Sequence, residues 1–450
     1  MANLIQRDIQ AEAVFKLTQF RALCITGPRQ SGKTTLSKVL FKDKPYVNFE
    51  TPTTQAAFES NPSAFLKKYA SGAIFDEVQR VPLLFRFLQE MLDRNTKRGQ
   101  FILTGSNNFL LQEQVSQSLA GRAGYLSLLP LSYAEINESK IAVDSVDELI
   151  LRGGYPEIWN EQLKPTNWLE SYVQTYVQRD VRLLKNINDL AAFKRFVFLC
   201  ANYAGQLLNR EDIAKKTGVD TKTIQSWMGL LESSYLIFML QPWFVNANKR
   251  MVKSPKLYFH DTGLLCYLLG IHNKTALKKH PQYGAIFENW AITEIQKNRL
   301  NQGIISPLYF YRDSAGNEID LVVDKNEEQF GIEIKSAKKV ETTMFKGLNH
   351  WNKFNPSANT LLIYGGDKAD EIKVARINDT DYTSLDEAIN AASDETTIEL
   401  LNDAATAGKA LEAAFKSFDK SALTAEQKKT YEDIEDDARE HAEHIGANAG

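Results

Sequence analysis

Short apolar runs alternate with helical stretches over the first 135 residues of the chain. The runs start at Ala22, Tyr46, Ala73 and Phe101, and each is only three to five residues long. Strands that alternate with helices along a chain usually form a parallel sheet, because each connection crosses back over the sheet. The pattern therefore predicts an α/β domain with a parallel sheet over residues 1–135.

The pattern changes after this domain. From 151 to 275 apolar residues recur three and four positions apart, as in the stretch from Trp168 to Leu184, which predicts a helical domain. From 276 to 375 we expect a second α/β domain, in which a helix precedes three strands and a further helix precedes a last strand. The expected strands are Leu308–Arg312, Glu318–Val323, Gly331–Lys335 and Leu361–Tyr364.

The last segment, residues 380–450, is rich in Ala, Asp, Glu and Lys at helical spacing. We expect an acidic helical tail there, which is either a truncated or fused module or a solubilising helical hairpin. From 376 on, 18 acidic residues face 7 basic ones, so the first 375 residues carry a net charge of +8 although the whole chain carries −3. A mildly basic body is compatible with a nucleic-acid partner, and it is equally compatible with ordinary solvated surface.

Composition narrows the class of protein. A hydrophobic content of 43% with 24% charged residues is typical of a globular protein, and 450 residues suit two to four domains. The N-terminus lacks the features of a signal peptide, and no membrane span is visible, so we expect a cytoplasmic protein. Three widely spaced cysteines argue against a disulfide framework and against a Cys-rich zinc site.

A phosphate-binding loop, or P-loop, follows the first apolar run. The segment from Gly27 to Thr34 fits the pattern GxxxxGK[ST], lies after a strand and opens a helix. Glycines let the backbone N–H groups face phosphates, Lys33 neutralises phosphate oxygens, and the Thr34 hydroxyl can bind Mg²⁺. The residues that we expect to bind ATP are Gly27, Pro28, Arg29, Gln30, Ser31, Gly32, Lys33, Thr34 and Thr35.

Acidic residues at the end of the third apolar run supply the second half of this site. We expect Asp76 to hold the Mg²⁺ shell with Thr34, and Glu77 to orient and deprotonate water. Asn107 follows the strand that starts at Phe101 and is a candidate sensor of the γ-phosphate. Arg122 is a candidate arginine finger, acting in its own chain or in a second one, and its alternative is an ordinary surface arginine.

A helix-turn-helix pattern lies in the helical domain. Residues 209–227 predict a helix, a turn that contains Gly218 and a second helix, and the apolar run that follows can supply wing strands. Lys222, Thr223 and Gln225 would project from the second helix toward DNA, and Lys249 with Arg250 could touch phosphates. The same layout also serves as a packing module, so both readings stay open.

A second carboxylate pattern lies in the last α/β domain. Strand alternation places Glu333 and Lys335 on one face, where they can converge with Asp320 and with Glu288 from the preceding helix. These residues resemble the core of PD-(D/E)xK nucleases, which implies that the carboxylates bind Mg²⁺ and the lysine activates water. Ile319 stands where the motif has proline. The alternatives are an inactive relic and an ion pair on an exposed edge strand.

The motifs together resemble a known family. The P-loop, Phe75-Asp-Glu-Val-Gln-Arg-Val-Pro82, Leu119-Ala-Gly-Arg-Ala123, Gly153-Gly-Tyr-Pro156 and Asp261-Thr-Gly263 are similar to those of prokaryotic AAA-like ATPases that carry a C-terminal domain of unknown function. The resemblance implies an ATPase with ATP and Mg²⁺ as cofactors. The fold that we expect is α/β: a P-loop NTPase parallel sheet, a helical or winged-helix region, a restriction-endonuclease-like domain and the acidic tail. The partner is DNA, a protein or a second copy of the chain.

Overall fold

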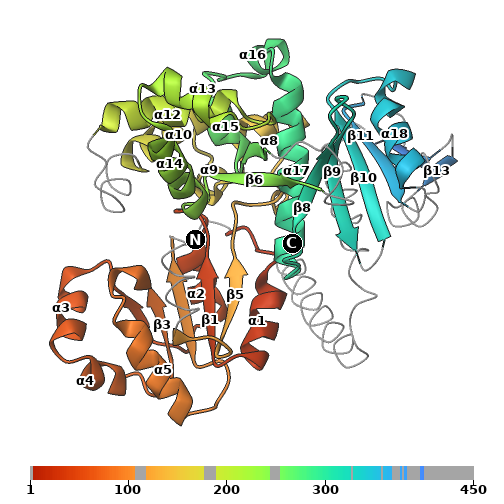
Figure 1. Cartoon of the computed structure of the whole chain (residues 1–450). Coiled ribbons are helices and arrows are strands. Elements are labelled where there is room, and N and C mark those ends of the chain that lie inside the picture. Colours follow the sequence, from red (N-terminus) through yellow and green to blue (C-terminus); the bar gives the residue numbers. More distant parts are fainter. Residues whose placement is uncertain are drawn as a thin grey trace.

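The computed structural model describes residues 4–106, 118–176, 189–243, 254–325, 328–355 and 358–366, and the backbone of 375–377, 380–382 and 396–399. Asn107, Lys249 and Arg250 lie outside these residues, as does everything from residue 400 on, where most of the predicted acidic tail falls. Figure 1 shows the five-stranded sheet of the N-terminal region at the bottom, a helical region above it and a second sheet beside the helices.

Five strands form the first sheet, in the order β2-β3-β4-β1-β5, and all of them are parallel. Four of them match the apolar runs of the sequence, which confirms the predicted parallel sheet, whereas the sequence did not predict β5. The strands are β1 (Ala22–Thr26), β2 (Tyr46–Asn48), β3 (Ala73–Asp76), β4 (Phe101–Gly105) and β5 (Ala123–Ser127).

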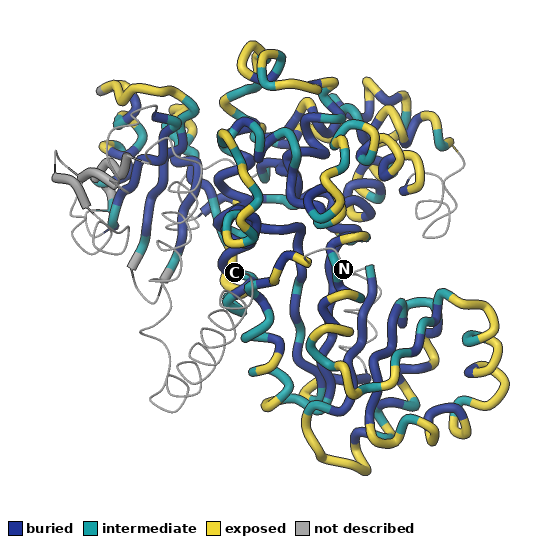
Figure 2. The backbone as a smooth tube through the Cα atoms, turned by 180° about the vertical axis from the view of Figure 1, so that it is seen from behind, coloured by how far each residue is buried: buried dark blue, intermediate teal, exposed yellow. Residues whose placement is uncertain are grey.

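Helices cover both faces of this sheet because its side chains alternate between two cores. One core contains Leu23 and Ile25 of β1, and the other contains Ala22 and Cys24 of the same strand. Figure 2 shows the strands as a buried layer between more exposed helices. The helices of this part are α1 (Gln10–Gln19), α2 (Lys33–Leu40), α3 (Pro52–Ser60), α4 (Pro62–Lys67) and α5 (Leu84–Arg94), with the short 3-10 helix η1 (Val78–Arg80).

The middle of the chain is helical, as predicted, but a β-hairpin interrupts it. The hairpin pairs β6 (Ile237–Pro242) with β7 (Lys256–Phe259) in antiparallel fashion. Before it come α7 (Tyr133–Glu138), α8 (Val146–Arg152), α9 (Pro156–Asn160), α10 (Pro165–Thr175), α12 (Leu190–Asn202), α13 (Arg210–Thr217) and α14 (Thr221–Ser233), and after it α15 (Thr262–Leu268) and α16 (Lys274–Lys279).

The second sheet is mixed and has seven strands in the order β14-β11-β10-β9-β8-β6-β7. The hairpin of the helical region therefore belongs to it, since β6 pairs with β8 at Gln241 and Pro242. The other elements are α17 (Tyr283–Asn301), β8 (Leu308–Arg312), β9 (Glu318–Lys325), β10 (Glu328–Lys335), η3 (Thr342–Phe345), α18 (Lys346–Phe354) and β11 (Asn359–Tyr364). In Figure 1 the long α17 runs between the helices and this sheet.

The start of the predicted tail is not helical where the structure describes it. β12 (Ala375–Ile377) pairs with β13 (Thr380–Tyr382), and β14 (Thr396–Glu399) adds to the edge of the second sheet beside β11. At β13 and β14 the predicted helical tail is therefore replaced by strands, and β14 pairs with the edge strand β11. The rest of the predicted tail from residue 400 lies outside the described residues. Among the described residues, no helix is both long and apolar enough to span a membrane.

Candidate nucleotide-binding site

The predicted P-loop connects β1 to α2, so its strand and helix context is present. Gly27 has a φ of 150° and Gly32 a φ of 94°, both of which favour glycine. A Cβ atom on Gly27 would lie 2.1 Å from the Leu128 carbonyl oxygen, so a larger residue does not fit. Helix α2 begins at Lys33, and the first turn of any helix presents N–H groups that lack intrahelical partners. These features shape the loop for an anion at the helix N-terminus.

Lys33 lies inside the loop. Its Nζ donates to the carbonyl oxygens of Gly27, at 3.0 Å, and Pro28, at 2.7 Å. Burial lowers the pKa of this ammonium to about 8, and the nearby carboxylates of Glu77 and Asp76 offset only part of that effect. The Ser31 hydroxyl is fully buried and has no hydrogen-bond partner among the described residues. The loop therefore holds a cation and an unused hydroxyl where phosphate oxygens would bind.

Arg7 fixes the loop from outside, and the sequence did not identify it. One of its Nη atoms donates to the Ser31 carbonyl oxygen at 2.7 Å, and the other donates to Leu129 at 2.7 Å. Its Nε pairs with Glu135 at 2.8 Å, and both side chains are buried. Glu135 also forms the capping box of α7 with Ser132. A buried, fully bonded guanidinium of this kind holds the loop backbone in place before any ligand binds.

Asp76 and Thr34, the two predicted Mg²⁺ ligands, lie within hydrogen-bond distance of each other. The Thr34 hydroxyl donates to Asp76 Oδ2 at 2.9 Å, and the Thr104 hydroxyl donates to Oδ1. The Tyr46 hydroxyl also donates to Oδ2, at 2.6 Å, and sequence analysis missed this contact. Burial, together with the hydrogen bond to Asp76, raises the pKa of Tyr46 well above its usual value. The carboxylate is thus bonded to neutral hydroxyls, which a divalent cation can replace or rearrange.

Glu77 stands at the end of β3 in a left-handed conformation, with a φ of 56°. Such a φ is uncommon outside glycine and is often found at functional sites. Gln79 Nε2 donates to Glu77 Oε2 at 2.5 Å and lies 3.4 Å from the Ser106 hydroxyl. Burial raises the pKa of Glu77, which is the shift that a general base requires.

Arg122 does not reach the loop of its own chain. Its guanidinium binds Asp93 through Nε at 2.5 Å and through Nη2 at 2.9 Å. Its carbonyl oxygen accepts from the N–H groups of Arg21 and Ala22 at the start of β1, whereas the P-loop follows the end of β1. The structure therefore does not bring Arg122 to the P-loop of its own chain, because Arg122 pairs with Asp93 at the opposite end of the parallel strands. A role toward a second copy stays a prediction.

The predicted DNA-contact residues lie at the start of α14, the second helix of the helix-turn-helix pattern. Gly218 ends α13 with a φ of 77°, and the Asp220 side chain caps α14. Lys222 and Gln225 are exposed. Thr223 is less available, because its hydroxyl donates to Asp220 at 2.7 Å.

The four nuclease-like residues also come together, around β9 and β10. Lys335 Nζ lies 3.3 Å from Asp320 and 2.5 Å from Glu333, and both carboxylates are buried. Since β10 lies between β9 and β11, the alternative of an exposed edge strand is wrong. Glu288 of α17 faces the same centre, where it binds Lys256 of β7 at 3.2 Å. The sequence did not identify Lys256, which lies 32 residues before Glu288 and belongs to the hairpin.

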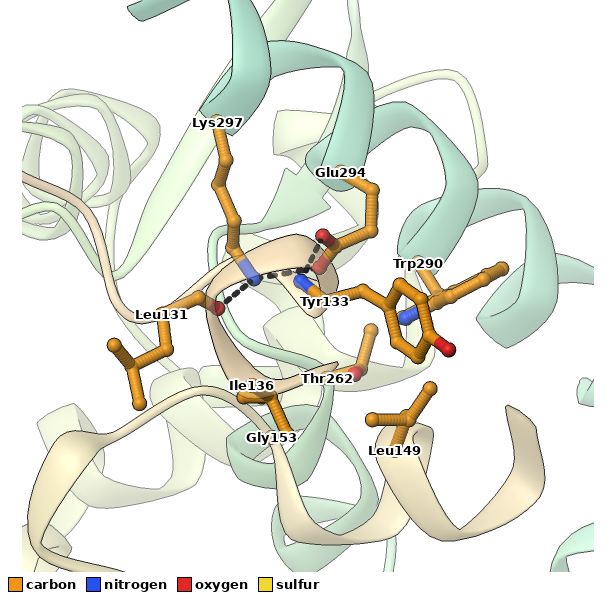
Figure 3. Close-up of a pocket in the computed structure, with 9 residues that line it drawn as sticks. All are labelled: Leu131, Tyr133, Ile136, Leu149, Gly153, Thr262, Trp290, Glu294 and Lys297. Atoms are coloured by element: carbon orange, nitrogen blue, oxygen red, sulfur yellow. Dashed lines mark hydrogen bonds and ion pairs between the residues drawn. The ribbon is translucent and has the colours of Figure 1, made fainter. Parts of the chain in front are cut away.

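A small pocket is lined by residues that belong neither to the P-loop site nor to the group around Asp320 (Figure 3). Lys297 of α17 donates to Glu294 at 2.8 Å and to the Leu131 carbonyl oxygen at 2.9 Å. Glu294 accepts from the Tyr133 N–H at 2.7 Å. Because these charged groups bind one another, they connect α17 to residues 131–133, which follow β5 of the first sheet.

Three protein-family models match the chain in succession. Residues 19–137 match an AAA domain, residues 143–275 match a domain of unknown function (DUF8612), and residues 283–381 match another domain of unknown function (DUF4143). An uncharacterized protein of Mycobacterium tuberculosis is 32% identical over 333 residues, which are 73% of this chain and 74% of that protein. An uncharacterized protein of Haemophilus influenzae is 24% identical over 367 residues, with 74% and 85% covered.

The solved structures compared with the chain are only weakly similar to it. The Walker-type ATPase of Pyrococcus abyssi has a TM-score of 0.42 and 13% identity, covering 59% of this chain and 96% of its own. The RuvB Holliday junction branch migration motor of Thermotoga maritima has a TM-score of 0.30 and 17% identity, covering 52% and 89%. Because both scores are low, we draw no argument from them.

Proposed function

The chain belongs to the family in which an AAA ATPase domain is followed by two domains of unknown function, and on this premise we propose that it hydrolyses Mg·ATP to change how its C-terminal regions meet a partner. The observation that carries the proposal is the joint placement of the loop, the Thr34–Asp76 hydrogen bond and Glu77.

Each residue has a distinct task in this reaction. Lys33 exchanges the carbonyl oxygens of Gly27 and Pro28 for phosphate oxygens. Thr34 and Asp76 would hold Mg²⁺, which neutralises charge that develops on the transferred phosphoryl group. Glu77 accepts a proton from the attacking water while Gln79 keeps its carboxylate in position.

Tyr235 supports the second half of the proposal, the coupling to the C-terminal regions. Its hydroxyl lies 2.6 Å from the hydroxyl of Thr26, the residue before the P-loop, and 3.3 Å from that of Ser127 at the end of β5. Tyr235 stands between α14 and β6, in a left-handed conformation with a φ of 57°. A shift of the loop end of β1 therefore acts directly on the junction between the helix-turn-helix pattern and the hairpin.

DNA is the partner that the exposed surface favours. Lys222 and Gln225 project from the first turns of α14, and residues of these types bind phosphates and base edges. A protein partner is the alternative. Filter binding of duplex DNA, with and without ATP, separates the two, since affinity for DNA should fall steeply as salt is raised. The absence of salt-sensitive binding would contradict a DNA partner, and salt-sensitive binding that Lys222→Ala and Gln225→Ala leave unchanged would contradict a contact through α14.

Steady-state ATP hydrolysis tests the enzymatic part. Lys33→Ala should reduce turnover about 10²- to 10³-fold, since one preorganised cation at the phosphates is lost. Glu77→Gln should retain ATP binding and lose turnover by a similar factor. Lys42→Ala removes an exposed lysine just after α2 and is the matched control, with turnover near that of the wild type. Equal turnover in wild type and Glu77→Gln would refute the role of Glu77.

A further inference from the structure

The buried carboxylate centre of the second sheet contains more cations than a metal-dependent nuclease needs. Lys335 binds Asp320 and Glu333 on one side. On the other side Lys256 binds Glu288 at 3.2 Å, pairs with Glu318 and lies 4.0 Å from Asp320. The Lys256 side chain is only 3% exposed. Its ammonium therefore stands among three carboxylates inside the protein.

Most of the oxygens that would face a metal ion already have partners. Glu288 Oε1 accepts from Lys256 and from the Tyr258 hydroxyl. Asp320 Oδ2 accepts from the Ile334 N–H at 2.8 Å and from Lys335 at 3.3 Å. Glu333 Oε2 is buried without a hydrogen-bond partner in the described part of the chain, but it is one oxygen rather than a coordination set. Within that part, no group of three or more acidic, histidine or cysteine side chains is arranged to hold a metal. The residues present do not fit Mg²⁺.

We infer that Lys256 of β7 takes the place of the divalent cation in this nuclease-like centre, so that the centre holds no metal, ties the β6–β7 edge of the second sheet to β9 and α17, and has no metal-dependent nuclease activity. A lysine that bridges Glu288 of α17 with Glu318 and Asp320 of β9 joins three elements by ion pairs in a buried setting. Because breaking such a pair would leave uncompensated buried charges, the intact pairs hold the hairpin in position.

The position of Lys256 gives the centre a role in coupling. Lys256 pairs with Leu240 in the hairpin, and the other end of β6 starts two residues after Tyr235. The hairpin is thus linked to the first sheet through Tyr235, just before β6, and to α17 and β9 through Lys256. The centre acts as the anchor of that hairpin and not as a second active site.

Mn²⁺ binding to the nucleotide-free full chain tests the inference, with calorimetry as the measurement. Wild type should show no saturable uptake that depends on Asp320. Lys256→Gln, which keeps a side chain of similar length without its charge, should gain one further saturable Mn²⁺ site per chain. That site should disappear when Asp320→Asn is added. Lys274→Gln is the matched control, because Lys274 also bridges two carboxylates, Asp144 and Glu148, at the surface.

Two results of the Mn²⁺ titration would overturn the inference. The first is Mn²⁺ uptake by wild type that Asp320→Asn abolishes, and the second is a folded Lys256→Gln that gains no site. If Lys256→Gln folds poorly, its melting temperature with and without Mn²⁺ still tests the inference. Mn²⁺ should raise the melting temperature of that variant and leave the melting temperature of the wild type unchanged. A wild-type melting temperature that Mn²⁺ raises, and that Asp320→Asn makes insensitive, would show a resident metal site. Mg²⁺-dependent cleavage of plasmid DNA by wild type, lost in Lys335→Ala, would contradict the inference as well.

Discussion

The buried carboxylates at Asp76 of the first sheet and at Asp320 of the second sheet differ in what their oxygens bind. At the first sheet Asp76 accepts from the hydroxyls of Thr34, Tyr46 and Thr104, while Lys33 turns toward loop carbonyl oxygens. At the second sheet the carboxylates pair with two ammonium groups, those of Lys256 and Lys335. The first centre keeps its negative charge for an incoming cation, whereas the second has its charge compensated from within.

This difference shows why a motif alone does not define a metal site. Both centres place acids on buried strands with a lysine nearby, and their sequence patterns are similarly suggestive. A hydroxyl partner costs little to rearrange when a metal binds, but an ammonium ion in a buried ion pair competes with the metal for the same oxygens. The residue that decides the outcome at the second centre, Lys256, comes from a distant strand.

The largest contrast should appear in stability. Lys256→Ala removes the cation from a buried set of carboxylates and should lower the free energy of unfolding by about 3–5 kcal/mol. Lys33→Ala removes a cation that contacts carbonyl oxygens, so we expect a change within about 1 kcal/mol. Urea unfolding followed by circular dichroism measures both. Equal losses in the two variants would mean that the two centres do not differ as described.

Lowering the pH should destabilise the folded chain through His260, the residue that follows β7 of the hairpin. Burial, aided by the charge of Lys297, lowers the pKa of His260 to about 3. The folded chain keeps His260 neutral, but the unfolded chain protonates it below pH about 6.5 and so binds more protons. Stability therefore falls as the pH drops from about 6.5 toward 3, by about 1.4 kcal/mol per pH unit.

His260→Phe isolates this effect, because the new ring can still pack on Phe238, whose ring centroid lies 4.8 Å from that of His260. Between pH 7 and pH 5 the unfolding free energy of the variant should rise relative to wild type by about 2 kcal/mol. Denaturant titrations at the two pH values measure the difference. A constant difference would show that His260 does not remain neutral in the folded chain.

Tyr46→Phe probes the hydroxyl partners of the first centre. Without the Tyr46 hydroxyl, Asp76 loses one of the groups that orient it, and the Mg²⁺ concentration for half-maximal ATPase activity should rise about 5- to 10-fold. The maximal rate at saturating Mg²⁺ should change much less. Tyr69→Phe, a tyrosine of the adjacent apolar core, is the control. A lower maximal rate with an unchanged Mg²⁺ requirement would assign Tyr46 a different task.

Tyr235→Phe tests the connection between the two centres and should have the smallest effect. The ring still packs, but the hydrogen bonds to Thr26 and Ser127 are lost, each worth about 1 kcal/mol. ATP should slow hydrogen exchange in β6 and β7 about threefold in wild type and not in the variant. Ser233→Ala, at the end of α14, is the control. Retained ATP-dependent protection in Tyr235→Phe would place the coupling elsewhere.

Sequence alone predicted the parts of the site that are local. The strand, loop and helix around Gly27–Thr34 were found because their spacing and apolar context are contiguous, and Asp76 with Glu77 because they end an apolar run. β5 was missed, since its sequence Ala-Gly-Tyr-Leu-Ser carries only a weak apolar signal. The domain boundaries stay predictions.

The partners of these residues were missed because they come from far along the chain. Arg7 reaches Glu135 across 128 residues, and Tyr235 reaches Thr26 across 209. No spacing rule connects such positions. Arg122 shows the opposite error, since its motif suggested a role that its pairing with Asp93 excludes within one chain. Long-range packing, and not local pattern, decides these cases.

Calorimetric titration of Mg·ATP into the purified full chain is the most direct test that the loop from residue 27 to residue 35 binds a triphosphate. We predict one saturable site per chain in wild type and in Lys42→Ala, and no measurable binding in Lys33→Ala. A folded wild-type protein that gives no binding heat at any temperature tried, or a Lys33→Ala variant that binds as tightly as wild type, would contradict the central claim.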